Sequence, residues 1–528
     1  MYQVFHSIPS WARADGDTYA APDDLRDIYR FARALARHFR GRVQAWEVWN
    51  EPDIRFFSHP SSECAAFQKA AFLGFRAEDP TQLVLGPSMA HGPCPFAEGL
   101  LQNGVGHYLD VWNYHIYADP SAYAARTRGY RDLLRRWGVD VPFWVTEAGD
   151  RVRGPQGILS RESRVHQAAF VSRAFAQALA AGVQRHFWFV FPFYREGEVG
   201  WGVFEPDQRA PFPALAALAT ATYAMGRGRY LGRLEFVPPT QQEAPGSDPL
   251  HALGDSLARA LGFDRGDGSE ALVVWREADQ PAEVVLPLRW WQVKEARNHV
   301  GTPLPHAEGE VRVSVGRAAP YFILPAGALK GKLTVDPAPA PVVRAAPPAL
   351  PAVVVRLRVA DAAVDKDSDT YVVAPAGQIA LQAEVYNFGD TPFEGEVQLS
   401  ASDGWHVDRV DASQKVLPGE RAVLPTQLHT PDHLSRGTLT AIAAAGQKKS
   451  APAVLALQID GNRAKARATY LLPLDRPEAW AKNIAEHGSM EVSPGPEGGV
   501  RFHFLFSYAG DNWAYPQARF DPPLDLSA

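Results

Sequence analysis

Cysteine is almost absent from this chain, which has two among 528 residues. So few cysteines exclude a fold held together by disulfides and a zinc site built from several thiolates. Basic residues are not in excess, because 53 Lys and Arg stand against 59 Asp and Glu and the formal net charge is −6. That balance predicts no nucleic-acid partner. Long apolar runs are missing as well, so we predict no membrane span.

The chain is long enough for three or four domains, and its pattern changes along the way. The first 226 residues alternate short apolar strands with amphipathic helices, which is typical of an α/β fold with parallel strands. After a first strand near the N-terminus, strands are predicted at 43–49, 83–87, 111–117, 143–146 and 186–191. A first helix is predicted from Leu25 until Gly41 ends it, and later helices at 130–137, 162–181 and 214–225.

Six strand–helix units can be counted in this part of the chain. A closed (β/α)8 barrel needs eight, so we expect its first two βα units to be missing and the sequence to be a fragment at both ends. An open doubly wound sheet would need no further strands, but its Gly-rich phosphate loop follows none of the predicted strands. We therefore predict a multidomain protein that begins with a TIM barrel and continues with all-β sandwich domains.

The helical pattern fades after residue 226. Residues 227–332 alternate in the manner of a small accessory β-sandwich, and 333–352 form a linker rich in Pro and Ala. Residues 353–458 are predicted to be an immunoglobulin-like sandwich. A β-rich region of carbohydrate-binding type, cut off by the end of the chain, is expected at 459–528. These β-domains and the linker favour a secreted or periplasmic location over a cytoplasmic one.

Two predicted strands end in acidic residues. The strand at 43–49 leads into Asn50 and Glu51, and three units later the strand at 143–146 leads into Glu147. A single glutamate at a strand end is usually a solvated loop residue. Two of them at the carboxyl ends of barrel strands have the arrangement that cleavage of a glycosidic bond requires. One protonates the leaving oxygen, and the other attacks the anomeric carbon or activates water.

The sequence around these two glutamates resembles a known group of enzymes. Trp49-Asn-Glu-Pro52 and Thr146-Glu-Ala-Gly149 are similar to the two catalytic strand ends of the clan A glycoside hydrolases. The segment before Pro52 is most similar to family 39, which includes β-xylosidases and α-L-iduronidases, and residues 1–226 carry the similarity. The resemblance implies a retaining (β/α)8 enzyme that uses neither a metal nor an organic cofactor.

By position, the resemblance implies that Glu51 is the general acid/base and Glu147 the nucleophile. It also implies that Asn50 hydrogen-bonds the 2-hydroxyl of the sugar. The clan usually adds an Arg on its second strand, for which this chain has no counterpart. Glu47 should point the same way as Glu51 because strand side chains alternate, and we expect it to form a structural ion pair below the site.

Three further residues match substrate-binding positions of the clan. His115 and Tyr117 match a pair on the sixth strand that orients the nucleophile, and Trp188 matches an aromatic residue on the eighth strand that floors the sugar subsite. Aromatic faces suit the C–H surfaces of a pyranose ring, and His supplies directional hydrogen bonds. Ordinary packing inside the barrel is the alternative interpretation for all three.

The leading hypothesis is a retaining O-glycoside hydrolase that cleaves oligo- or polysaccharides by double displacement. It requires the two carboxyl groups to lie about 5 Å apart, whereas a gap of about 6.5–9.5 Å would indicate inversion. The alternative is a non-catalytic carbohydrate-binding or surface protein whose barrel has degenerated. Both hypotheses predict an oligo- or polysaccharide partner, and the sequence does not identify the sugar.

Overall fold

The computed structural model begins with six short parallel strands. They are β1 (Tyr2–Phe5), β2 (Ala45–Val48), β3 (Leu83–Leu85), β4 (Trp112–Ile116), β5 (Phe143–Ala148) and β6 (Val183–Trp188). The structure describes residues 1–154, 159–197, 199–238, 252–337, 339–360, 362–410, 413–461, 476–484, 488–495, 499–506 and 515–518. Every residue of β2 and β4 is buried, as expected for parallel strands covered on both faces.

Backbone pairing joins the six strands in sequence order. Parallel ladders link β1–β2–β3 and β4–β5–β6, and isolated parallel bridges such as Leu85–Val111 connect the two groups. No ladder joins β1 to β6 among the described residues. Instead, the rings of Tyr2 on β1 and Phe187 on β6 lie 4.8 Å apart. The two edges of the sheet therefore meet through side chains.

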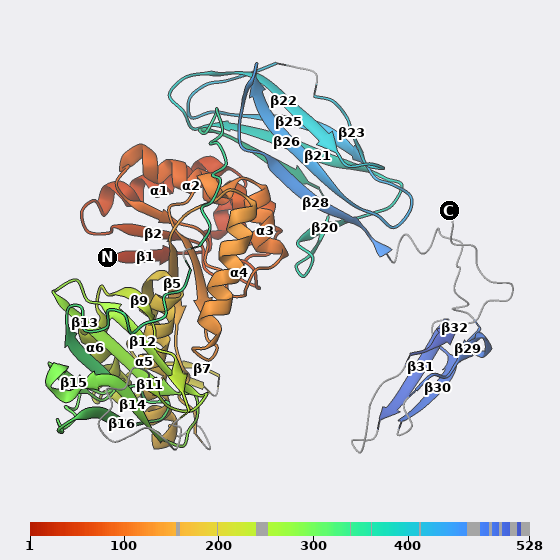
Figure 1. Ribbon diagram of the computed structural model, residues 1–528. Coiled ribbons are helices and arrows are strands. Elements are labelled where there is room, and N and C mark those ends of the chain that lie inside the picture. The colour runs from red at the N-terminus through yellow and green to blue at the C-terminus, as the bar shows by residue number, and fades with distance from the viewer. Residues whose placement is uncertain are drawn as a thin grey trace.

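Helices follow the strands and cover the outside of this sheet (Figure 1). They are α1 (Leu25–His38), α2 (Ser61–Glu78), α3 (Pro95–Gln102), α4 (Ala122–Arg136), α5 (Arg161–Ala180) and α6 (Pro213–Met225). Asp24 caps α1 by accepting a hydrogen bond from the Arg26 backbone N–H, and Ser160 caps α5 in the same way. Proline opens α3 and α6, where its missing N–H removes no helical hydrogen bond. Beyond β6, the strands β7 (Tyr194–Glu196) and β8 (Val199–Trp201) form a hairpin.

A β-sandwich follows α6. One sheet has the order β10-β11-β14-β16 and the other β15-β17-β13-β12-β9. The strands are β9 (Arg229–Arg233), β10 (Phe236–Val237), β11 (Ala252–Leu253), β12 (Ala258–Asp264), β13 (Ser269–Arg276), β14 (Ala282–Arg289), β15 (Glu295–Arg297), β16 (Glu310–Val315) and β17 (Tyr321–Pro325). Ala217 and Ala221 of α6 share a hydrophobic cluster with Val273 and Tyr321, so the sandwich packs against this helix.

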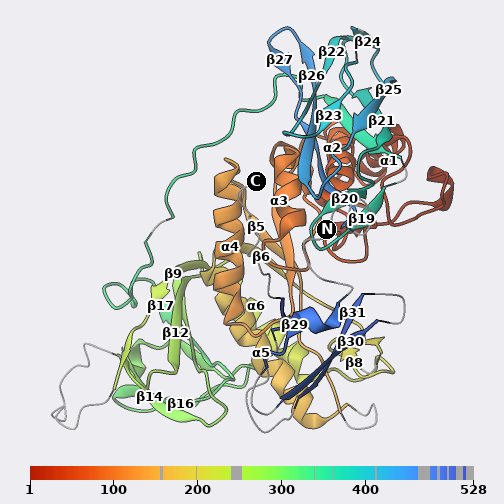
Figure 2. The ribbon, with the colours of Figure 1, turned by 90° about the vertical axis from the view of Figure 1, so that its right-hand side faces the viewer.

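The described residues between β17 and residue 353 form no regular strand. In Figure 2 this segment runs past α4 toward the upper part of the molecule. The Arg344 guanidinium lies 2.9 Å from the Asp140 carboxylate, and the Ala345 N–H donates to the Gly138 carbonyl at 2.9 Å. These contacts attach the segment to the turn that follows α4.

A second sandwich lies over α1 and α2 (Figure 1). Its sheets are β18-β21-β25-β23 and β19-β20-β28-β26-β22-β24. The strands are β18 (Val353–Val359), β19 (Ala363–Asp365), β20 (Thr370–Val373), β21 (Gln378–Asn387), β22 (Phe393–Ala401), β23 (His406–Val407), β24 (Gln414–Val416), β25 (Arg421–His429), β26 (Arg436–Ala445), β27 (Lys448–Lys449) and β28 (Ala453–Ile459). Phe388 stacks on Tyr29 of α1 with ring centroids 4.5 Å apart.

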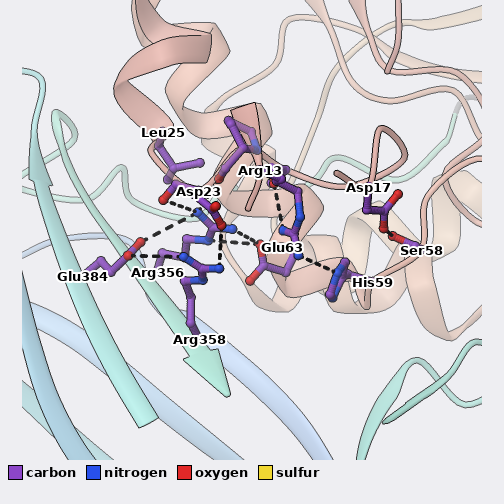
Figure 3. A network of polar contacts seen from close by, with 12 residues as sticks. Arg13, Asp17, Asp23, Leu25, Ser58, His59, Glu63, Arg356, Arg358 and Glu384 are labelled. Carbon is purple, nitrogen blue, oxygen red and sulfur yellow. Dashed lines mark hydrogen bonds and ion pairs between the residues drawn. The ribbon is translucent and has the colours of Figure 1, made fainter. Parts of the chain in front are cut away.

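Buried ions join this second sandwich to α2. The Arg356 guanidinium on β18 pairs with the Glu63 carboxylate at 2.5 Å and lies 3.7 Å from the Glu384 carboxylate (Figure 3). Arg356 also donates to the Pro22 carbonyl at 2.7 Å. Since all three charged side chains are almost fully buried, the second sandwich and the α/β part share one interior.

The last described strands form two small pairs. They are β29 (Trp480–Ala481), β30 (Gly488–Pro494), β31 (Val500–Phe506) and β32 (Gln517–Ala518), paired as β29–β32 and β30–β31. Among the helices described here, none has the length and apolar character needed to cross a bilayer.

Candidate active site

Two glutamates and a histidine converge at the carboxyl ends of β2, β4 and β5. The Nδ1 atom of His115 lies 2.7 Å from Oε1 of Glu51 and 3.4 Å from Oε2 of Glu147. These three atoms lie within 4.8 Å of one another. His115 is fully buried, while both carboxylates remain partly exposed. The structure therefore brings the two predicted carboxylates together around one imidazole.

An unusual backbone conformation aims Glu51. Glu51 has φ of +46° and Trp49 has φ of +78°, values that cost a residue with a side chain about 1–2 kcal/mol. The loop after β3 supports this turn, because the Glu51 N–H donates to Ser88 Oγ at 3.3 Å and the Ser88 N–H donates to the Trp49 carbonyl at 3.2 Å. Such strain is typical of a position where the fold re-aims a side chain for a task.

A register shift aims Glu147. Tyr114 on β4 pairs with Val145, but the next residue, His115, pairs with Glu147, so Thr146 is an extra residue on β5. In a regular strand the side chains of Thr146 and Glu147 would point to opposite faces of the sheet. The bulge places both on the inner side, where Thr146 Oγ1 lies 3.4 Å from the side-chain amide of Asn113 and Glu147 faces His115.

Glu47 lies in a polar layer beneath the site. It accepts hydrogen bonds from the Tyr2 hydroxyl at 2.6 Å and from the Asn113 side-chain amide at 2.7 Å. The expected ion pair does not form among the described residues, where Glu47 hydrogen-bonds these neutral groups and the hydroxyls of Ser88 and Thr146. Burial raises the pKa of the Glu47 carboxyl. The Glu47 side chain points from β2 to the inside of the sheet, as strand alternation predicted.

Opposing effects set the protonation of the central groups. Burial alone would lower the pKa of His115, but its hydrogen bond to Glu51 and the charge of Glu147 outweigh burial and raise that pKa. Burial raises the pKa of Glu147 despite the opposing effects of His115 and the Tyr117 hydroxyl. The Tyr117 hydroxyl donates to Oε2 of Glu147 at 2.7 Å. A donor at this oxygen favours the ionised carboxylate, which is the form that attacks carbon.

The same three side chains offer ligand atoms for a small divalent cation. Each atom already has a partner of its own, however, because His115 pairs with Glu51 and Tyr117 donates to Glu147. A metal would have to displace these hydrogen bonds.

The remaining predicted residues lie in different surroundings. Asn50 is half-buried beside Glu51 and forms a parallel bridge with Ser88. The structure does not bring Trp188 together with the glutamates. Its ring contacts Phe170 of α5 at 6.1 Å, on the side of β6 that faces the helices. Strand alternation explains this, because Phe187 points to the inside of the sheet and Trp188 therefore points out.

Two aromatic residues near Glu147 escaped the sequence analysis. The ring of Phe189 lies 6.1 Å from that of Tyr117, and Trp201 of β8 lies 4.9 Å from Tyr117. The indole N–H of Trp201 is buried and has no hydrogen-bond partner in the described part of the chain. Strand alternation could have identified Phe189, because it lies two residues after Phe187 and so should point to the same side of β6. No sequence signal places Trp201, because a hairpin carries it back to the site.

Searches with the sequence find no match among protein-family models or curated proteins. Solved structures similar to the chain include a family 39 glycoside hydrolase from the gut symbiont Bacteroides cellulosilyticus WH2. It has 17% identity and a TM-score of 0.48 over 61% of this chain and 67% of that one. A GH39 β-xylosidase from Caulobacter crescentus has 16% identity and a TM-score of 0.39 over 59% and 74%. A GH30 endoxylanase from Clostridium papyrosolvens C71 has 11% identity and a TM-score of 0.41 over 60% and 75%. Likeness at these levels does not define a reaction, which has to follow from the residues of the site.

Proposed function

We propose that this protein is a retaining O-glycoside hydrolase in which Glu51 is the general acid/base and Glu147 the nucleophile. The observation that carries the proposal is the separation of the two carboxylates, whose facing oxygens lie within 4.8 Å of each other. Retaining glycosidases hold their carboxyl groups about 5–5.5 Å apart, whereas inverting enzymes leave about 6.5–9.5 Å for a water molecule. The short gap supports double displacement.

The reaction follows from this geometry in two steps. Glu147 attacks the anomeric carbon as Glu51 gives its proton to the leaving oxygen, and a glycosyl ester forms on Glu147. Glu51, now ionised, takes a proton from water, whose oxygen attacks the same carbon and releases Glu147. The Tyr117 hydroxyl holds one oxygen of Glu147 in place. His115 lies between the carboxylates and keeps them close without full charge repulsion.

We also propose that the six parallel strands belong to a (β/α)8 barrel at residues 1–226, followed by the domains 227–332, 353–458 and 459–528 and the linker 333–352. The contact between Tyr2 and Phe187 supports a sheet that curls toward closure. Separate hydrophobic clusters in the two sandwiches support the division of the β-rich part. Only part of 459–528 is described, and a carbohydrate-binding role there stays a prediction.

Product stereochemistry tests the proposed reaction. The protein is offered a panel of aryl xylosides, glucosides and arabinofuranosides, and the first sugar released is observed by proton NMR before it mutarotates. We expect the product anomer to match the substrate anomer, because two inversions at one carbon restore its configuration. Release of the opposite anomer would contradict double displacement. Binding of sugars without any hydrolysis would favour the non-catalytic alternative.

A further inference from the structure

A hairpin of the second sandwich reaches the loop that follows Glu51. Lys366 lies in the turn between β19 and β20, and its Nζ donates to the Pro52 carbonyl at 3.0 Å and to the His59 carbonyl at 3.3 Å. Three residues later, Asp369 accepts a hydrogen bond from the Ser61 N–H at 2.7 Å. One turn of the second sandwich therefore holds both ends of the β2–α2 loop and the first residue of α2.

Lys366 makes these contacts beside an aromatic ring and at a partly buried position. Its ammonium lies 4.4 Å from the centroid of the Phe96 ring, and its side chain is half-buried between the two domains. The attraction between a cation and an aromatic face is stronger where the pair is shielded from water. Without Lys366, the Pro52 and His59 carbonyls would lose this donor in a partly buried interface.

The middle of the loop is held by contacts within the α/β part, where the Trp49 indole N–H donates to the Phe56 carbonyl at 2.8 Å and the Ser58 N–H donates to the Tyr19 carbonyl at 2.7 Å. Between β2 and α2 the chain forms turns, and the far side of the loop is fixed by Asp53, which accepts from the Ala90 and His91 N–H groups at 2.8 Å each. Pro52 follows Glu51 directly, and Glu51 already has a strained φ of +46°. Holding the Pro52 carbonyl therefore opposes relaxation of the backbone that aims the Glu51 carboxyl group.

We infer that Lys366 is a positioning residue for Glu51, so that the second sandwich is part of the catalytic unit and not a detachable module. This inference rests on the proposed function. A misplaced acid/base should harm most the substrates that need protonation of the leaving group. Dinitrophenol leaves without that proton, whereas unsubstituted phenol requires it.

The test compares Lys366→Met with the unchanged protein on phenyl and dinitrophenyl glycosides. We expect kcat/KM for the phenyl glycoside to fall about 10- to 100-fold and kcat/KM for the dinitrophenyl glycoside to fall much less, because kcat/KM reports on formation of the glycosyl ester and not on its later hydrolysis. Lys366→Arg should recover part of the loss. Lys415→Met is the matched control, because Lys415 is an exposed cation of the same sandwich, paired with Glu394 at 2.6 Å.

Each outcome separates the two proposals. Equal losses on both substrates, or none, would overturn the role of Lys366 while the hydrolysis of the unchanged protein still stands. Adding Lys366→Met to Glu51→Gln should change nothing further, and an additive loss would also contradict the inference. If Lys366→Met fails to fold, Lys366→Gln, which keeps an N–H donor, undergoes the same comparison. No hydrolysis by the unchanged protein would instead overturn the proposed function.

A different surface of the second sandwich brings three metal-ligating side chains together. His406 on β23 is the direct cross-strand neighbour of His429 on β25, and Asp408 lies two residues beyond His406. Oδ1 of Asp408 lies 2.9 Å from Nε2 of His429, a hydrogen bond that a metal would replace, and 3.7 Å from Nε2 of His406. The three ligand atoms fall within 4.8 Å of one another. Tetrahedral Zn²⁺ with bonds near 2.1 Å spaces its ligands by about 3.4 Å, which lies between these two distances.

We propose that His406, Asp408 and His429 form a zinc site that ties β23 to β25. β23 is a two-residue edge strand, so a metal bridge would stabilise its attachment. The ligands are partly exposed, which leaves water access to the remaining coordination position. This proposal is independent of the reaction at Glu51 and Glu147.

Zinc titration of the full chain tests the site. In a Glu147→Gln background, which weakens the other cluster of possible ligands, we expect Zn²⁺ to bind at about one equivalent and to raise the melting temperature. His429→Ala should abolish both effects. His433→Ala is the matched control, because His433 is exposed and lies 3.0 Å from Asp432 but belongs to no three-ligand cluster in the described part of the chain. Unchanged zinc binding in His429→Ala would overturn the proposal.

Discussion

Replacing Glu147 by Gln is expected to abolish hydrolysis while sugar binding survives. The amide has the size of the carboxylate and can still accept a hydrogen bond from Tyr117, which now lies 2.7 Å from Oε2. It lacks the negative charge needed to form a glycosyl ester. We expect kcat/KM to fall by about 10³-fold or more on every aryl glycoside, including those with good leaving groups, because no covalent intermediate can form.

The control for this prediction is Glu98→Gln. Glu98 is a partly exposed carboxylate on α3 whose partner, Arg136, is 3.5 Å away, and its replacement should leave kcat/KM nearly unchanged. Sugar binding is followed through the fluorescence of the tryptophans, one of which, Trp201, lies 4.9 Å from Tyr117. A Glu147→Gln protein with activity close to that of the unchanged protein would remove Glu147 from the reaction. Loss of binding together with activity would indicate a collapsed site instead.

The sequence predicted most elements of the α/β part because their patterns are local. The helix from Leu25 begins where its apolar spacing begins and has Asp24 as its cap. The sequence pattern did not single out α2, and the structure shows why. Its outer face carries Glu63 and Lys69, both buried because the second sandwich covers them, and Gln68 is buried on the opposite side, where it donates to the Leu85 and Tyr108 carbonyls. An amphipathic pattern cannot appear in a helix that is buried on several sides by contacts distant in sequence.

The sequence predicted most residues of the candidate site, but it predicted less well where their side chains point. Glu51 and Glu147 come from strand ends that sequence patterns locate. Their convergence depends on a positive φ at Glu51 and a bulge at Thr146, which propensities do not reveal. The prediction for β6 also missed by one residue, because Phe189 lies 6.1 Å from Tyr117 whereas the predicted Trp188 lies against Phe170 of α5. Period-two alternation decides the face of a side chain, so an error of one residue reverses it.

Replacing Arg356 by Met is expected to lower the free energy of unfolding by about 3–5 kcal/mol. The Arg356 side chain is 1% exposed, and its partners Glu63 and Glu384 are 4% and 2% exposed. Met has a similar length but no charge, so Glu63 would lose the cation it pairs with and Glu384 would keep only the longer contacts to Arg421 and Arg358, at 3.8 and 3.9 Å. Denaturation with urea, followed by tryptophan fluorescence, measures the effect. Arg344→Met, which breaks an exposed pair with Asp140, should cost less than about 1 kcal/mol.

The pH dependence identifies the cause of this loss. Burial tends to raise the pKa of Glu63, but Arg356 outweighs burial and lowers it, so in the unchanged protein Glu63 contributes stability that disappears only as the pH falls. In the Met variant the largest effect that opposes burial is lost and only the weaker effects of His59 and Arg358 remain, so the pKa of Glu63 in the folded state should rise above its unfolded value. Protonation of Glu63 then favours the folded state of the variant. The difference in free energy of unfolding between the unchanged protein and the variant should therefore narrow as the pH is lowered from about 7 to about 5. A difference that stays constant over this range would mean that lost packing, and not stranded charge, destabilises the variant.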